Sequence, residues 1–134
     1  MALDLVTIDE ARQHLRLDAG DSGGGPDDLW LEIFIPAISE AVSLWVKDDA
    51  RLYSPEIDSS GDVVLDSSGE PVPVEPLSVR PVVKAAVLLE LSSVYRYREG
   101  EGKDNAVTPD AGHGYVLNKA STSLLTPLRR STVR

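Results

Sequence analysis

The apolar residues near the start of the chain recur at helical spacing behind a capping signal. Thr7 and Glu10 have the spacing of a capping box, in which each side chain accepts a hydrogen bond from the other residue's backbone N–H. The apolar residues that follow keep the intervals of one helix face: Ile8, Ala11 and Leu15. The pattern predicts a first helix that ends near Leu17 or Asp18, before a flexible Gly-rich link at residues 19–26.

A longer apolar stretch predicts a second helix from Asp27 or Asp28 to about Lys47. Carboxylates at its start favour the positive end of the helix dipole. Pro36 lies inside and is expected to bend the helix, because it removes one backbone hydrogen bond. The stretch is more apolar than one buried face requires, so we expect a neighbouring subunit to cover part of it. The predicted subunit–subunit packing residues are aromatic: Trp30, Phe34 and Trp45.

Residues 51–80 have a different character, with four prolines and few long apolar runs. Two segments, 58–62 and 66–70, form an eight-residue pseudo-repeat of the type Asp-Ser-Ser-Gly-acid, separated by a short apolar run. Turn, short strand and turn is the natural interpretation of this order. We therefore predict a small β-hairpin-like insert between the second and third helices.

A third helix is predicted from Pro81, which suits a first helical turn, to a stop at Gly100 or Gly102. Residues 100–114 are expected to form a loop, residues 115–117 a short strand, and residues 121–125 a last short helix. The predicted fold is therefore mainly α: a small domain of about three main helices plus a short C-terminal helix. We assign residues 1–119 to a helical domain that carries the 51–80 insert, and residues 120–134 to a C-terminal docking segment.

The net charge and its distribution along the chain bear on which partners the protein can bind. The net charge of −9 argues against a protein that binds duplex DNA, because such affinity comes largely from Lys and Arg on phosphates. The charge is also uneven: residues 1–50 carry 11 acids and 3 bases, whereas residues 81–134 carry 5 acids and 8 bases. Opposite charge at the two ends suits head-to-tail contacts between copies, although two solvated ends would give the same pattern.

Composition adds expectations about compartment. The chain has no cysteine, which excludes disulfides and thiolate metal sites and fits assembly in a reducing cytoplasm. The start of the chain lacks the features of a signal peptide, and we expect no apolar stretch to approach the length of a membrane span. We expect a soluble protein that does not associate with membranes.

No residue pattern predicts catalysis, a cofactor or a metal. His14 is expected to be structural, and His113 with Asp110 gives too few ligands for a metal site. The glycines at 23–25 precede Asp27 and Asp28 rather than a lysine, which argues against a phosphate-binding loop. The stretch from residue 58 to residue 66 lacks the ligand alternation of a calcium loop. We therefore predict a protein that is not an enzyme.

Four blocks of the sequence, in this order, resemble the head–tail connector (adaptor) family of long-tailed bacteriophages, the type that docks on the portal. The blocks are Val6–Leu17, the acidic helix start Asp27–Leu29 with its following apolar residues, Pro81–Leu89 with Tyr95 and Arg98, and Leu124–Arg129. The chain departs from the family pattern in its long 51–80 insert and its long Gly-rich link.

The resemblance implies a structural virion protein at the head–tail interface, assembled in the host cytoplasm. It implies a homo-oligomeric ring of about a dozen copies between the portal protein and a stopper or tail-completion protein. DNA would pass through the ring without specific binding, and acidic side chains near the lumen would repel its phosphates. We expect the C-terminal segment, as a basic and weakly anchored tail, to dock on the portal. Its predicted docking residues are Leu124, Leu125, Leu128, Arg129 and Arg130.

Two other classes of function stay open at this point. One is another phage morphogenesis protein, such as a small terminase subunit or a tail-completion protein. A small terminase subunit should carry a basic helix-turn-helix, which the acidic first half does not supply. The other is an intracellular helical protein-binding module unrelated to virions.

Overall fold

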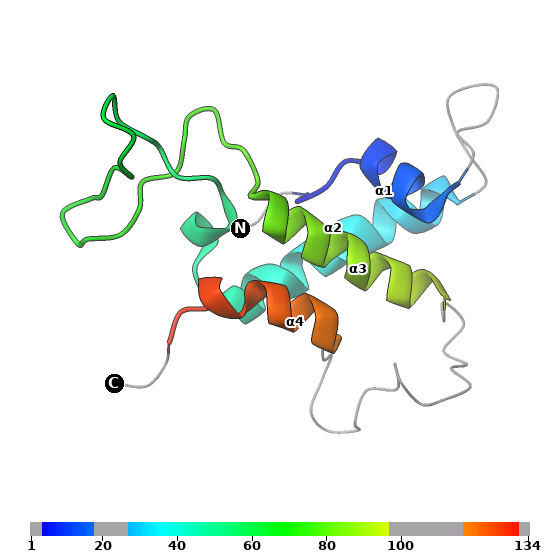
Figure 1. The fold of residues 1–134 in the computed structure, drawn as a ribbon. Helices are drawn as coiled ribbons and strands as arrows, with labels where there is room; N and C mark the ends of the chain where they lie inside the picture. Colours follow the sequence, from blue (N-terminus) through cyan, green and yellow to red (C-terminus); the bar gives the residue numbers. More distant parts are fainter. Residues whose placement is uncertain (1–3, 18–26, 97–116, 132–134) are drawn as a thin grey trace.

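The computed structural model describes residues 4–17, 27–96 and 117–131, and within them the fold is mainly α, as predicted (Figure 1). The elements, in chain order, are α1 (Ile8–Leu15), α2 (Asp28–Val46), the 3₁₀ turn η1 (Asp49–Leu52), α3 (Pro81–Arg96), α4 (Lys119–Leu125) and the 3₁₀ turn η2 (Thr126–Leu128). The four α-helices gather into one body, and the segment between η1 and α3 projects from one end of it (Figure 1). The predicted stop of the third helix, the 100–114 loop and the 19–26 link lie outside the described residues.

The predicted capping box is present at the start of α1. Thr7 Oγ1 accepts from Glu10 N at 3.1 Å, and Glu10 Oε1 accepts from Thr7 N at 3.0 Å. The hydrogen bond from the Thr7 backbone N–H lowers the pKa of Glu10 below its ordinary value of 4.5, and the ion pair with Lys84 Nζ at 3.0 Å acts in the same direction. The helix ends where Arg16 adopts a left-handed conformation.

Arg12 joins α1 to the start of α2. Its side chain is only 10 % exposed, and its Nε donates to Asp28 Oδ1 at 3.0 Å while Nη1 donates to Asp9 at 2.9 Å. Hydrogen bonding to Asp28, and then the charges of both carboxylates, raise the pKa of Arg12 above its usual range. The acidic start of α2 therefore holds a cation from another helix in addition to meeting the helix dipole.

The second helix runs through Pro36 and ends before Lys47, whose backbone is left-handed. By length and composition α2 could also cross a membrane, the one helix of the described ranges that could, so the expectation that no stretch approaches this length was wrong. Core helices pass the same test, and the buried residues of α2 belong to the core. These residues are Leu31, Ile35, Ile38, Ser39, Val42 and Val46.

The core lies where α2, α3 and α4 meet, with α1 closing one side. Two fully buried serines in it are paired: Ser39 Oγ accepts from Leu5 N at 3.0 Å, and Ser121 Oγ donates to the Ala86 carbonyl at 3.0 Å. Glu90, 1 % exposed, accepts from the backbone N–H of Asn118 at 3.0 Å. These bonds tie the chain before α1 and the start of α4 to the central helices.

The insert was predicted as a β-hairpin, and that part of the fold prediction was wrong. Among the described residues, 53–79 form isolated antiparallel bridges rather than strands, pairing Tyr53 with Val79, Pro55 with Pro73, Ile57 with Val63, and Leu65 with Pro71. Proline lacks a backbone N–H, so a continuous ladder cannot pass through Pro55, Pro71 or Pro73. Each of these prolines instead stands at a bridge position where its neighbours supply the hydrogen bonds.

The pseudo-repeat was correctly interpreted as a pair of turns. Asp58 Oδ1 accepts from Ser60 N and Asp62 N, and Asp66 Oδ1 accepts from Ser68 N and Glu70 N, all at 2.8–3.0 Å. The glycine of each turn has positive φ, 88° at Gly61 and 80° at Gly69, a region that glycine enters without steric cost. The two sequence repeats are therefore two copies of one turn.

Candidate functional site

The outward face of α2 carries exposed apolar side chains. Leu29, Ile33 and Leu44 are 70 %, 58 % and 70 % exposed. Their spacing of four and eleven residues places them on one side of the helix, and Ala37 and Glu40 continue the same line with exposed side chains. We call Leu29, Ile33, Ala37 and Leu44 the α2 stripe. Its aliphatic side chains have no covering among the described residues of the chain.

The predicted packing residues Trp30 and Phe34 lie beside this stripe, half-buried. Their rings stack at 4.5 Å between centroids, and Tyr95 of α3 meets Trp30 edge-on at 5.1 Å. Trp30 Nε1 is buried with no hydrogen-bond partner within the described ranges. The structure thus uses these two aromatic residues largely inside the subunit, and the residues one position earlier, Leu29 and Ile33, present the free apolar surface.

Trp45, the third predicted packing residue, is half-buried under the C-terminal segment. The Arg129 guanidinium lies 4.5 Å from the centre of its ring, and Arg129 Nε donates to the Trp45 carbonyl at 3.1 Å. A hollow of about 360 Å³ opens next to this contact. We call it the α2 hollow; its lining residues are Ala41, Leu44, Trp45, Leu117 and Arg129.

A second, open hollow of about 700 Å³ lies on the other side of Leu44, at the end of α2. Its lining residues are Glu40, Ser43, Leu44, Lys47, Asp48, Asp49 and Arg130. Two of its three acids have partners within the chain: Asp49 with the Ser43 hydroxyl, and Asp48 with Arg51 at 3.5 Å. Leu44 is therefore an exposed apolar ridge between two hollows, with Glu40, Lys47, Arg129 and Arg130 around it.

The predicted docking residues of the C-terminal segment divide into two groups. Leu125 is fully buried, and Leu124 and Leu128 pack partly against the same core, whereas Arg129 and Arg130 are exposed. The expectation of a weakly anchored tail was wrong for residues 120–131, the described part of the C-terminal docking segment. Arg51 Nη1 donates to the Leu128 carbonyl at 3.3 Å and Arg130 N donates to the Val46 carbonyl at 2.9 Å. Leu125 is thus a core residue of its own subunit, and only the other four remain open to a partner.

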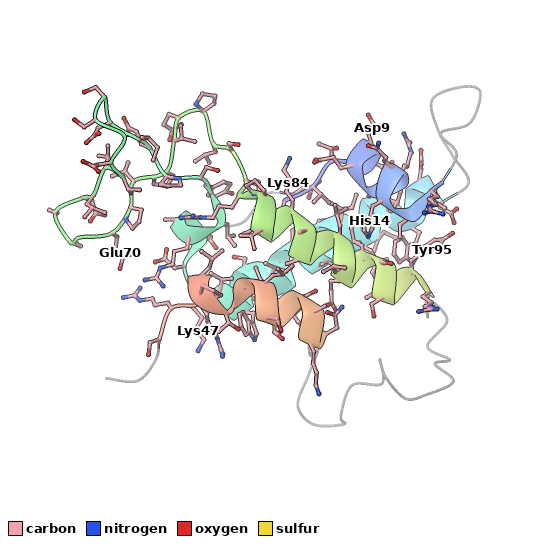
Figure 2. The ribbon with its side chains drawn as sticks, in the orientation of Figure 1. Asp9, His14, Lys47, Glu70, Lys84 and Tyr95 are labelled. Carbon is pink, nitrogen blue, oxygen red and sulfur yellow. The ribbon has the colours of Figure 1, made fainter. Side chains whose placement is uncertain are left out.

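Arg51 also fixes the insert to the helical body. Its Nη2 contacts both carboxylate oxygens of Glu70 at 3.2 and 3.3 Å, and Arg80 Nε donates to the Arg51 carbonyl at 3.0 Å. Figure 2 shows Glu70 on the edge of the insert that is nearest the C-terminal segment. One arginine thereby connects η1, the insert and η2.

The structure offers little for chemistry. No group of three metal-ligating side chains occurs within the part of the chain that is described. His14 is exposed on α1, beside a shallow hollow with Glu10, Gln13 and Leu88. His113, Asp110 and the glycines at 23–25 lie outside the described residues. That the protein is not an enzyme and takes no cofactor stays a prediction.

Comparison with protein-family models, curated proteins and solved structures gave no match to this chain. The resemblance to head–tail connectors therefore rests on the four sequence blocks. In the structure these blocks lie on α1, on the first part of α2, on α3, and on the end of α4 with η2, and Arg98 lies outside the described residues. The four blocks thus make up the helical body, and the insert lies between the second and the third block.

Proposed function

We propose that this chain is a structural subunit of a tailed bacteriophage particle, a head–tail connector that works as a ring. The ring would join the portal of the DNA-filled head to a stopper or tail-completion protein and extend the DNA channel. The observation that carries the proposal is the α2 stripe, a row of apolar side chains left open on a helix whose other side forms the core.

The free energy of the hydrophobic effect gives this stripe a reason to bind protein. Burying an exposed leucine or isoleucine is worth about 1.5–3 kcal/mol, and contiguous apolar surface on a monomer marks an interaction site. Leu29 and Leu44 lie 15 residues apart along α2, so the stripe spans about 22 Å. A surface of that length suits a lateral neighbour in a ring better than a small ligand, for which its shallow hollows give no enclosure.

The charge of the insert supports the channel role. Residues 53–79 contain six acids and no lysine or arginine. Such a surface repels phosphates, so DNA would slide past it without being held. Portal docking through Leu124 and Leu128 fits the same proposal, with the partner meeting an ordered surface around η2.

The test is complementation of a phage that lacks the gene. Particles without the protein should have filled heads that lose DNA and carry no tails, seen by electron microscopy. The double variant Leu29→Glu/Ile33→Glu should fail to restore tailed particles, because charges on the stripe prevent a neighbour from covering it. The matched control is Glu32→Gln, an exposed change on the same turn of α2.

Two results would overturn the proposal. One is absence of the protein from purified virions, and the other is normal tail joining by the stripe variant. Salt-sensitive, sequence-preferring binding to duplex DNA by the isolated chain would point to a small terminase subunit instead.

A further inference from the structure

The centre of the insert is a closed ring of three backbone hydrogen bonds. Glu56 N donates to the Val72 carbonyl at 2.7 Å, Val72 N to the Val64 carbonyl at 2.9 Å, and Val64 N to the Glu56 carbonyl at 2.9 Å. Three extended segments therefore meet, each bonded to the other two. With the two Asp-capped turns and the Arg51–Glu70 contact, this arrangement makes the insert an ordered unit.

The bridge pairs of the insert place six apolar residues on one face. Residues opposite one another in a bridge share a face, and alternate residues of an extended segment return to it. Following the bridges around the three segments gives one set, which we call the insert face: Pro55, Ile57, Val63, Leu65, Pro71 and Pro73. Ile57, Val63 and Leu65 are 53 %, 41 % and 57 % exposed.

The surroundings of the insert face are acidic. Every charged side chain in residues 53–79 is a carboxylate, and all of them except Glu70 are exposed. The insert projects from the helical body (Figure 1), and Ile57, Val63 and Leu65 of the insert face are exposed in their own subunit. Its partner should therefore present apolar surface with cations around it.

The same chain carries a surface of that kind. Leu44 stands between the two hollows: the α2 hollow has Arg129, and the second hollow has Lys47 and Arg130 together with the acids Glu40, Asp48 and Asp49. Figure 2 shows Lys47 beside the C-terminal segment, away from the projecting insert. The α2 hollow has apolar walls and one cation and no acid among its lining residues. The insert face, which is rimmed by acids, is complementary to the α2 hollow, whose lining is apolar with Arg129 at its side.

We infer that the insert face of one copy docks on Leu44 and the α2 hollow of the next copy. The two surfaces differ, so the contact is head-to-tail, the type that closes into a ring when the rotation between copies permits. The inference rests on the self-association within the proposed function and names the surfaces that make it. In this arrangement the insert supplies one half of the contact between copies, and the helical body supplies the other half.

Disulfide trapping tests the contact directly, because the natural chain has no cysteine. Concentrated Leu44→Cys/Leu65→Cys protein is oxidised and run on a non-reducing gel. The expected result is a ladder of cross-linked oligomers, since each copy carries both halves of the contact. The matched control is Leu29→Cys/Leu65→Cys: Leu29 is as exposed as Leu44, at 70 %, but lies about 22 Å away along α2.

Charge exchange is the second arm of the experiment. In the trapping background, Asp62→Lys and Arg130→Glu should each lower the ladder yield by roughly five-fold, and the two together should restore it. Both side chains are exposed, and Asp62 contributes to its turn through its backbone, so the fold is kept; circular dichroism checks this.

Each outcome decides the matter. No ladder from the Leu44/Leu65 pair, or an equal ladder from the Leu29/Leu65 control, would overturn the inference. Loss of the ladder without recovery in the double charge exchange would overturn its electrostatic part. If trapping fails while tail joining still depends on the α2 stripe, the inference falls and the proposed function stands.

Discussion

Shortening Leu125 to alanine tests whether the C-terminal segment belongs to the folded core. Leu125 is the last residue of α4, it is completely buried, and it lies in the same cluster as the buried residues of α2 and α3. If the segment were a loosely attached arm, its truncation would leave the unfolding of the helical body unchanged. In the structure it contributes one of the largest fully buried side chains.

The expected loss follows from burial. Replacing a fully buried leucine by alanine removes its transfer free energy and leaves a cavity, at a cost of about 2–5 kcal/mol. Since α4 is only seven residues long and can shift toward the gap, we expect about 3 kcal/mol. Against a total stability of about 5–15 kcal/mol, this is a fifth or more of the free energy of unfolding. For a chain of this size, it lowers the Tm by roughly 10–15 °C.

Urea titration followed by far-ultraviolet circular dichroism and by tryptophan fluorescence measures the effect, because Trp30 and Trp45 lie near opposite ends of α2. Coincident transitions would justify a two-state free energy. The matched control is Leu44→Ala, which removes the same atoms from a side chain that is 70 % exposed and should change stability by less than about 0.5 kcal/mol. A loss at Leu125 as small as the control's would refute the assignment of α4 to the core.

Four further predictions concern the hydrogen bonds and turns. Ser39→Ala should cost about 1–3 kcal/mol in the urea titration, because it leaves the buried N–H of Leu5 without its acceptor; an unchanged midpoint would contradict this. Since the folded pKa of Glu10 is lowered, its contribution to stability is complete above pH 4.5 and is lost as pH falls below that value; the stability difference between wild type and Glu10→Gln should therefore shrink between about pH 6 and about pH 3. Thr7→Ala should cost about 1 kcal/mol at neutral pH, and no change would argue against the capping box. Gly61→Ala meets no atom within 4 Å but must adopt φ 88°, so it should speed amide hydrogen exchange in the insert while leaving global unfolding nearly unchanged.

The position of the exposed apolar surface shows why side-chain size was a poor guide to the candidate site. Trp30 and Phe34 were the obvious choices for contacts between copies, since large aromatic residues are common at interfaces. Each has a partner within its own subunit, however, and the neighbouring aliphatic residues Leu29 and Ile33 are the exposed ones. When apolar residues lie on most sides of a helix, the sequence pattern does not indicate which side packs against the core of its own subunit.

The sequence by itself determined the local features of this protein. The capping box, the helix start at Pro81, the short C-terminal helix and the paired turns of the pseudo-repeat depend on residues within a few positions of one another, so their spacing was enough to predict them. The mainly helical class followed from the same local patterns.

Only the tertiary structure decided which surfaces are free. It closed the insert into three bonded segments instead of a hairpin, because Glu56 pairs with Val72, sixteen residues away. It buried Leu125 and covered Trp45 with Arg129, contacts that join residues far apart in the chain. Burial depends on the neighbours that packing brings from distant segments, and the spacing of residues along one element carries no record of them.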